Sequence, residues 1–172
     1  HTTAAAAASN AFVDETARVV ASVHASSSLI GYSPQRAFDG DPASAWCEGN
    51  TAVGIKGDGV GQWLEVRLRS SVVPQAVRVS GGWPYDSPRA KHRTGDGDMW
   101  SKSNVVTRLK VEWDTGSTIV GFSREKDRGV EKTVALGIAT KKIRFTVLAV
   151  SGGRGGNNVR IFAGGDAWYP RA

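Results

Sequence analysis

Residues 62–69 read QWLEVRLR, a stretch in which apolar and charged side chains alternate from Leu64 onward. Successive side chains of a β-strand point to opposite faces of the sheet, so this period of two predicts a strand with one buried face. The side chains expected toward the core are Leu64, Val66 and Leu68, and those expected on the opposite face are Trp63, Glu65, Arg67 and Arg69.

Seven further stretches have the length and composition of short strands, with connectors such as GGWPYD, SGGRGGNN and AGGD among them. No convincing long helix interrupts the pattern, and residues 12–20 predict either one helical turn or the approach to the first strand. Many short strands without long helices are typical of a sandwich of antiparallel sheets. We therefore predict an all-β fold of about eight strands, the others being residues 19–26, 72–79, 104–113, 117–122, 130–136, 141–150 and 158–163.

The length of 172 residues is enough for one domain with a hydrophobic core. Residues 1–11 are rich in Ala and Thr, and we expect them to form a flexible linker or a tag remnant. Residues 12–172 are then the single domain. No stretch approaches the roughly 18 consecutive apolar residues that indicate a membrane-spanning helix.

The net charge of +6 and an isoelectric point near 9.8 favour anionic partners. Charge alone suggests nucleic acid, acidic glycans or anionic membrane surfaces. The excess is modest and the chain has no run of five or more basic residues. We therefore do not expect nucleic acid as a partner, and we keep an acidic glycan as the more specific expectation.

The stretch AFDGDPASAWCEG, residues 37–49, is open to four interpretations: a metal loop, a redox site, a ligand platform or a tight turn that buries a tryptophan. We expect Trp46 to be a core anchor under this turn, the alternative being an exposed stacking face. Cys47 is the sole cysteine, which excludes an internal disulfide and a cysteine-based zinc site. No neighbouring His or Lys would activate it, so we expect a small, partly buried apolar residue.

Six motifs occur in order: YSPQRAFDGDPASAWCEG, GVGQWLEVRL, VVPQAVRVSGGW, SNVVTRLKVEW, KKIRFTVLAV and NNVRIF. This series, over residues 21–163, resembles the discoidin-like, galactose-binding-like β-sandwich domains, which include many bacterial carbohydrate-binding modules. The likeness is closest to the bacterial NADase-type glycan-binding domains, through the DGD…AWxEG motif. The resemblance implies an eight-stranded jelly-roll sandwich, a ligand surface on the loops at one end, often a structural calcium ion, and no catalysis.

The turn at Asp39, Gly40 and Asp41 is the candidate calcium site. Calcium takes six to eight oxygen ligands, and this turn can supply carboxylates and backbone carbonyls. The alternative is a plain β-turn in which the first aspartate bonds its own backbone. The resemblance places a glutamate where this chain has an asparagine, which offers an oxygen without a charge. The candidate ligands are Arg36 (carbonyl), Asp39, Asp41, Ser44 (hydroxyl) and Asn158.

Residues 81–103, GGWPYDSPRAKHRTGDGDMWSKS, form the longest stretch without a strand pattern. Loops of this length in a compact domain are usually functional or disordered. Aromatic rings stack on the C–H faces of sugars, and charged or amide side chains bond to the hydroxyls, so this composition favours a saccharide site. The alternative is that both tryptophans cap the end of the sandwich. The candidate glycan-binding residues are Trp83, Tyr85, Arg89, His92, Arg93 and Trp100.

We predict a noncatalytic carbohydrate-binding module that recognises glycans through loops at one end of the sandwich. No Ser-His-Asp or Cys-His order stands out, so we do not expect an enzyme. The alternatives are a protein–protein or adhesion module that uses the same loops, and a binder of anionic membrane surfaces. We expect a bacterial, secreted or cell-envelope location and a larger parent protein.

Overall fold

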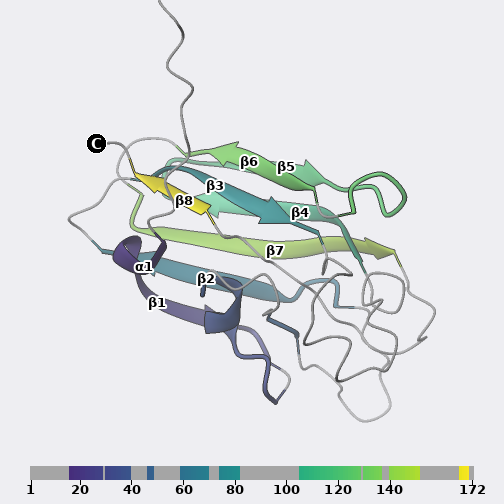
Figure 1. Ribbon diagram of the computed structural model, residues 1–172, viewed down its shortest axis with the longest axis horizontal. Coiled ribbons are helices and arrows are strands. Elements are labelled where there is room, and N and C mark those ends of the chain that lie inside the picture. The colour runs from purple at the N-terminus through teal and green to yellow at the C-terminus, as the bar shows by residue number, and fades with distance from the viewer. Residues whose placement is uncertain are drawn as a thin grey trace, which may run out of the picture.

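The computed structural model of the protein describes backbone and side chains of residues 16–28, 30–39, 46–48, 59–69, 76–81, 105–128, 130–136 and 140–151, and the backbone of residues 74, 75 and 167–170. Within these residues the chain forms two antiparallel β-sheets packed face to face (Figure 1). The helical elements are α1 (Thr16–Val19) and η1 (Pro34–Ala37), and the strands are β1 (Val20–Ala25), β2 (Trp63–Leu68), β3 (Pro74–Ser80), β4 (Val105–Trp113), β5 (Gly116–Gly121), β6 (Glu131–Ala135), β7 (Lys142–Ser151) and β8 (Ala167–Pro170).

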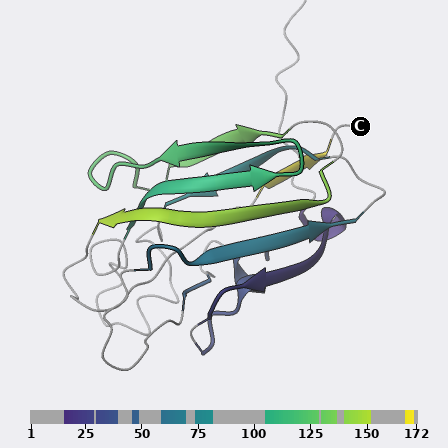
Figure 2. The same cartoon turned by 180° about the vertical axis from the view of Figure 1, so that it is seen from behind.

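The larger sheet has five strands in the order β1-β2-β7-β4-β5, and the smaller has three in the order β6-β3-β8. Figure 2 shows the larger sheet in front, with its outer face toward the viewer. β7 is central in this sheet because it pairs with β2 on one side and with β4 on the other. The residues on its two neighbours are therefore held in register across the whole sheet.

The core lies between the two sheets and is built from the inward-facing positions of both. From β2, Leu64 and Val66 are fully buried and Leu68 is 7% exposed, which confirms the predicted alternation. Val77 and Val79 of β3 face them from the smaller sheet. Each such aliphatic side chain contributes roughly 1.5–3 kcal/mol on burial. The polar face of β2 holds one exception, because Glu65 points outward and is nevertheless only 6% exposed.

The predicted all-β antiparallel sandwich is confirmed, with little helix among the described residues. Seven of the predicted strands agree with observed strands to within two residues at each end. Both alternatives for residues 12–20 occur in sequence, because the short helix α1 runs directly into β1. Among the described helices, none is long and apolar enough to cross a bilayer.

The last strand was not predicted. β8 pairs with β3 over the short sequence AWYP, with a register irregularity between Pro74 and Ala76. It is an edge strand, the position at which a proline is tolerated. The strand predicted at residues 158–163 lies outside the described residues, as does the predicted linker at residues 1–11.

Candidate functional site

One end of the sandwich, which we call the loop end, is where antiparallel pairing brings several strand termini together. β3 ends at Ser80, opposite the start of β6 at Glu131, and β4 begins at Val105, opposite the end of β7 at Ser151. The backbone N–H of Val106 donates to the carbonyl of Gly81 at 2.8 Å and so joins the two sheets at this point. The residues that flank the predicted saccharide stretch therefore both lie at the loop end (Figure 1).

Gly81 is a close backbone contact at the exit of β3. A Cβ atom there would lie 2.7 Å from the carbonyl oxygen of Val106 and 2.8 Å from Cγ of Phe122. Atoms at those distances overlap, so the site accepts only a residue without a side chain. The chain consequently leaves the smaller sheet at a fixed position.

A compact turn between β5 and β6 forms another part of the loop end. The backbone N–H of Ser123 donates to Oδ2 of Asp127 at 2.6 Å, and the N–H of Asp127 donates to the carbonyl of Ser123 at 2.9 Å. Nζ of Lys132 lies 3.2 Å from the same Oδ2. The hydrogen bond from the Ser123 backbone, with the charge and hydrogen bond of Lys132, lowers the pKa of Asp127 below its ordinary value of 3.8, against an opposing effect of desolvation.

Arg124 ties this turn to the end of β7. Its Nη1 donates to the carbonyl oxygen of Ser151 at 2.9 Å. Glu125 and Lys126 on the same turn are exposed. The described part of the loop end therefore exposes both an acidic and a basic side chain to solvent. Its backbone is fixed by hydrogen bonds within the turn and to the end of β7.

Serine and glutamine side chains join β1 to β2 beside Trp46 at this end. The hydroxyls of Ser26 and Ser27 each donate to Oε1 of Gln62 at 2.7 Å, and Trp46 Nε1 donates to the carbonyl of Ser27 at 3.0 Å. Trp46 is 1% exposed and Cys47 is fully buried. The interpretation of Trp46 as a core anchor is confirmed, and Cys47 is even more buried than predicted.

The candidate calcium turn is described only in part. Asp39 follows η1 directly, after Phe38, whose ring packs at 6.2 Å from the ring of Phe145. The carboxylate of Asp39 and the carbonyl of Arg36 are oxygen donors, which is the chemistry that calcium prefers. Across the described segments, no group of three His, Cys, Asp or Glu side chains could hold a metal ion. The other candidate ligands, Asp41, Ser44 and Asn158, lie outside those segments.

All six candidate glycan-binding residues lie outside the described residues, so their positions relative to one another stay a prediction. They are Trp83, Tyr85, Arg89, His92, Arg93 and Trp100.

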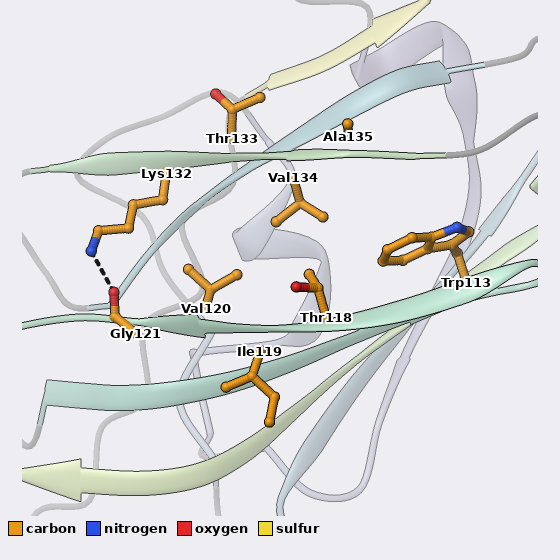
Figure 3. A pocket seen from close by; sticks show the side chains of 9 residues that line it. All are labelled: Trp113, Thr118, Ile119, Val120, Gly121, Lys132, Thr133, Val134 and Ala135. Atoms are coloured by element: carbon orange, nitrogen blue, oxygen red, sulfur yellow. Dashed lines mark hydrogen bonds between the residues drawn. The ribbon is translucent and has the colours of Figure 1, made fainter.

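A groove that sequence patterns did not indicate opens between the edge strands β5 and β6 (Figure 3). Its volume is about 530 Å³, and Val120 and Val134 point into it from the two strands. The indole of Trp113 bounds one side, and Lys132 reaches across the other to the carbonyl oxygen of Gly121. Finding this groove requires the order of the strands, because β5 and β6 belong to different sheets.

No protein-family model matches the chain, and no curated protein matches it either. Solved structures do match. CBM32-3 from a family 31 glycoside hydrolase of Clostridium perfringens has a TM-score of 0.60 at 17% identity, over 93% of this chain and 95% of that one. The family 32 CBM from C. perfringens NanJ, in complex with galactose, has a TM-score of 0.50 at 17% identity, over 83% and 90% of the two chains.

The arabinofuranosyltransferase AftD from Mycobacteria has a TM-score of 0.53 at 23% identity, over 79% of this chain. The present chain spans only 9% of that much longer protein. At these identities the likeness concerns the arrangement of the strands. This likeness shows that the chain has the galactose-binding-like fold, which is an all-β antiparallel jelly-roll sandwich.

Proposed function

We propose that this protein is a noncatalytic carbohydrate-binding module whose site is at the loop end. The observation that carries the proposal is the position of Gly81 and Val105, which bring both ends of the aromatic-rich stretch to one end of the sandwich. The match to CBM32-3 supports it, because that module is covered over 95% of its length. Over that length, the strands of this chain correspond to those of one binding module.

In this proposal, aromatic side chains supply most of the affinity and charged neighbours fix the orientation of the sugar. Trp83 and Trp100 stack on the apolar faces of the sugar rings, as aromatic walls of ligand pockets do. Arg89, His92 and Arg93 bond to hydroxyl or acidic groups, and Tyr85 adds a further aromatic contact. The nearer relationship to NADase-type glycan-binding domains belongs to this proposal, and it rests on the DGD…AWxEG motif.

A structural calcium ion at the Asp39 turn is part of the same proposal. Arg36 and Asp39 would hold it together with Asp41, Ser44 and Asn158. Bound calcium supplies positive charge that fixes carboxylates and carbonyls in one conformation. We also propose a secreted or cell-envelope location within a larger bacterial protein, where such a module would bring its parent to a glycan surface.

The test is a glycan array followed by calorimetry with the glycans that bind. Trp83→Ala and Trp100→Ala are compared with Ile119→Ala, which truncates an apolar side chain that is 51% exposed on β5, away from the loop end. We expect at least one tryptophan variant to bind about ten-fold more weakly or worse, because aromatic contacts with a ligand contribute on the order of 1–3 kcal/mol. Circular dichroism should stay unchanged in all three variants.

Three results would contradict the proposal. If both tryptophan variants bind glycans as tightly as the unchanged protein, the site is not on this stretch. If the array is empty while a specific protein partner is retained, the function is adhesion to a protein. Salt-sensitive binding to acidic vesicles with an empty array would point to a membrane surface instead.

A further inference from the structure

The outer face of the five-stranded sheet carries an excess of positive charge. Its strands contain five Lys and Arg residues against two Glu residues, which leaves a surplus of three positive charges. The inward positions of these strands are apolar and buried, so the charged side chains lie on the opposite face of the sheet. Figure 2 views the five-stranded sheet from this outer side. The basic residues are Arg67, Arg108, Lys110, Lys142 and Arg144, and the acidic ones are Glu65 and Glu112.

Glu65 is a single carboxylate shared by three cations, and Arg144 is the one that bonds it directly. Nε and Nη2 of Arg144 lie 2.9 and 2.8 Å from Oε2 of Glu65, and the Glu65 side chain is only 8% exposed. The same guanidinium lies over the ring of Trp63, at 4.1 Å from its centroid. A charge-assisted hydrogen bond and a cation–π contact thus hold Arg144 flat against the sheet.

Arg67 and Lys142 are exposed cations directly beside this pair. They face each other directly in the register of β2 and β7, and like charges in that position repel. Their nitrogens lie 3.9 and 4.0 Å from the carboxylate of Glu65, which is beyond hydrogen-bond length. Their side chains are 63% and 49% exposed, so both charged groups point to solvent.

The second carboxylate of this face is also engaged. Glu112 lies opposite Arg144 in the register of β4 and β7, but its Oε1 is 2.9 Å from Nζ of Lys110. Glu112 is therefore paired with a cation of its own strand. Among the described residues, Glu65 is the carboxylate within ion-pair distance of Arg67 and Lys142, and it already bonds Arg144.

We propose that Arg67 and Lys142, beside the Arg144–Glu65 pair, form a second binding surface, specific for a carboxylated or sulfated polysaccharide. An acidic group of the ligand would lie between Arg67 and Lys142 and remove their mutual repulsion. A sheet face with cations on strands about 4.8 Å apart suits an extended polymer that crosses the strands. The choice of a saccharide among polyanions rests on the proposed function, whereas the anionic character rests on the charges described above.

The first measurement maps the site. The ¹⁵N-labelled protein is titrated with polygalacturonate, and with dextran as a neutral polymer, while its backbone amide resonances are followed by NMR. We expect polygalacturonate to shift amides of β2 and β7 around Arg67 and Lys142, and dextran to leave them in place. Shifts confined to the loop end, or no shifts at all, would overturn this proposal without affecting the glycan site proposed for the loop end.

The second measurement uses charge variants. Arg67→Gln with Lys142→Gln removes two charges from the outer face. Arg78→Gln with Arg18→Gln, the control pair, removes two charges from β3 and from α1. We expect the first pair to weaken polygalacturonate binding about three- to ten-fold and to reduce its salt dependence, since two exposed ion contacts are lost. Both pairs have the same net charge, so an equal loss in both would overturn a specific surface.

The class of ligand is tested by competition at the same face. A DNA duplex and phosphatidylglycerol vesicles are titrated under the same ionic conditions as polygalacturonate. We expect polygalacturonate to bind the outer face more tightly than either. Tighter binding of DNA or of vesicles to this face would overturn the assignment to an acidic polysaccharide.

Discussion

The outer sheet face and the loop end both hold a carboxylate among cations, but they hold it by different means. At the loop end, Asp127 accepts a hydrogen bond from the backbone of Ser123, four residues away in the chain. On the sheet face, Glu65 is bonded by Arg144, which is 79 residues away. The first arrangement is fixed by a short turn, and the second exists only when β2 and β7 pair in the correct register.

This difference separates what each region can tolerate. The loop end is held by backbone hydrogen bonds and close backbone contacts, so it should respond mainly to substitutions that displace the backbone. The sheet face has a regular backbone and a side-chain ion cluster, so it should respond mainly to loss of charge. Pairs of matched variants test whether the loop end depends on its backbone and the sheet face on its charges.

The largest effect is expected for Gly81→Ala at the loop end. The new methyl group would meet the carbonyl oxygen of Val106 and the ring of Phe122 below 3 Å, and the backbone oxygen can move only with the strand. We expect a loss of about 2–3 kcal/mol in the free energy of unfolding, measured by urea denaturation. Gly121→Ala is the matched control, because its nearest neighbour, the carbonyl oxygen of Thr107, is 3.8 Å away. Equal losses in both variants would mean that the close contact at Gly81 is not what matters.

The next effect is expected for Glu65→Gln on the sheet face. The substitution keeps the shape of the side chain but leaves Arg67, Lys142 and Arg144 without their shared counter-charge. We expect a loss of about 1–2 kcal/mol, less than for a fully buried ion pair because the Arg144 side chain is 39% exposed.

Glu112→Gln is the control for Glu65, since its side chain is 40% exposed and pairs with Lys110 within one strand. We expect a change below about 0.5 kcal/mol for this variant. If the two glutamine variants lose the same stability, the burial of Glu65 under Arg144 does not add to its stabilising effect. The proposed sensitivity of the sheet face to loss of charge would then be wrong.

The same contrast separates what sequence patterns predict from what they miss. The alternation of residues 62–69 predicts β2 and its buried face, because strand periodicity is a local property of the chain. It also assigns Glu65 to a solvent face, and it misses the burial of that carboxylate, since the covering residue Arg144 comes from a distant strand. β8 was missed because four residues, AWYP, carry no period, and pairing with β3 decides their structure.

The prediction of site residues likewise succeeds where the signal is local in the sequence and fails where it depends on the pairing of distant strands. Trp46 could be assigned to the core from its place after a turn of small residues, and the structure buries it. The groove between β5 and β6 could not be predicted, because its walls come from the edges of two sheets. The six candidate glycan-binding residues lie outside the described residues and stay a prediction from composition.

The smallest effect, and the one that tests the loop-end carboxylate directly, is the pH dependence of Asp127. Its pKa is lowered in the folded protein, so the unfolded chain binds the proton more readily, and the charge of Asp127 contributes stability above the ordinary pKa. That contribution is lost as the pH falls through the lowered folded-state pKa.

We expect Asp127→Asn to be less stable than the unchanged protein at neutral pH, with a difference that shrinks below about pH 4. Urea denaturation over a pH series measures it, and Glu125→Gln, which removes an exposed carboxylate of the same turn, is the matched control. A stability difference for Asp127→Asn that stays constant into acid would assign its effect to the shape of the turn and not to the charge held by Ser123 and Lys132.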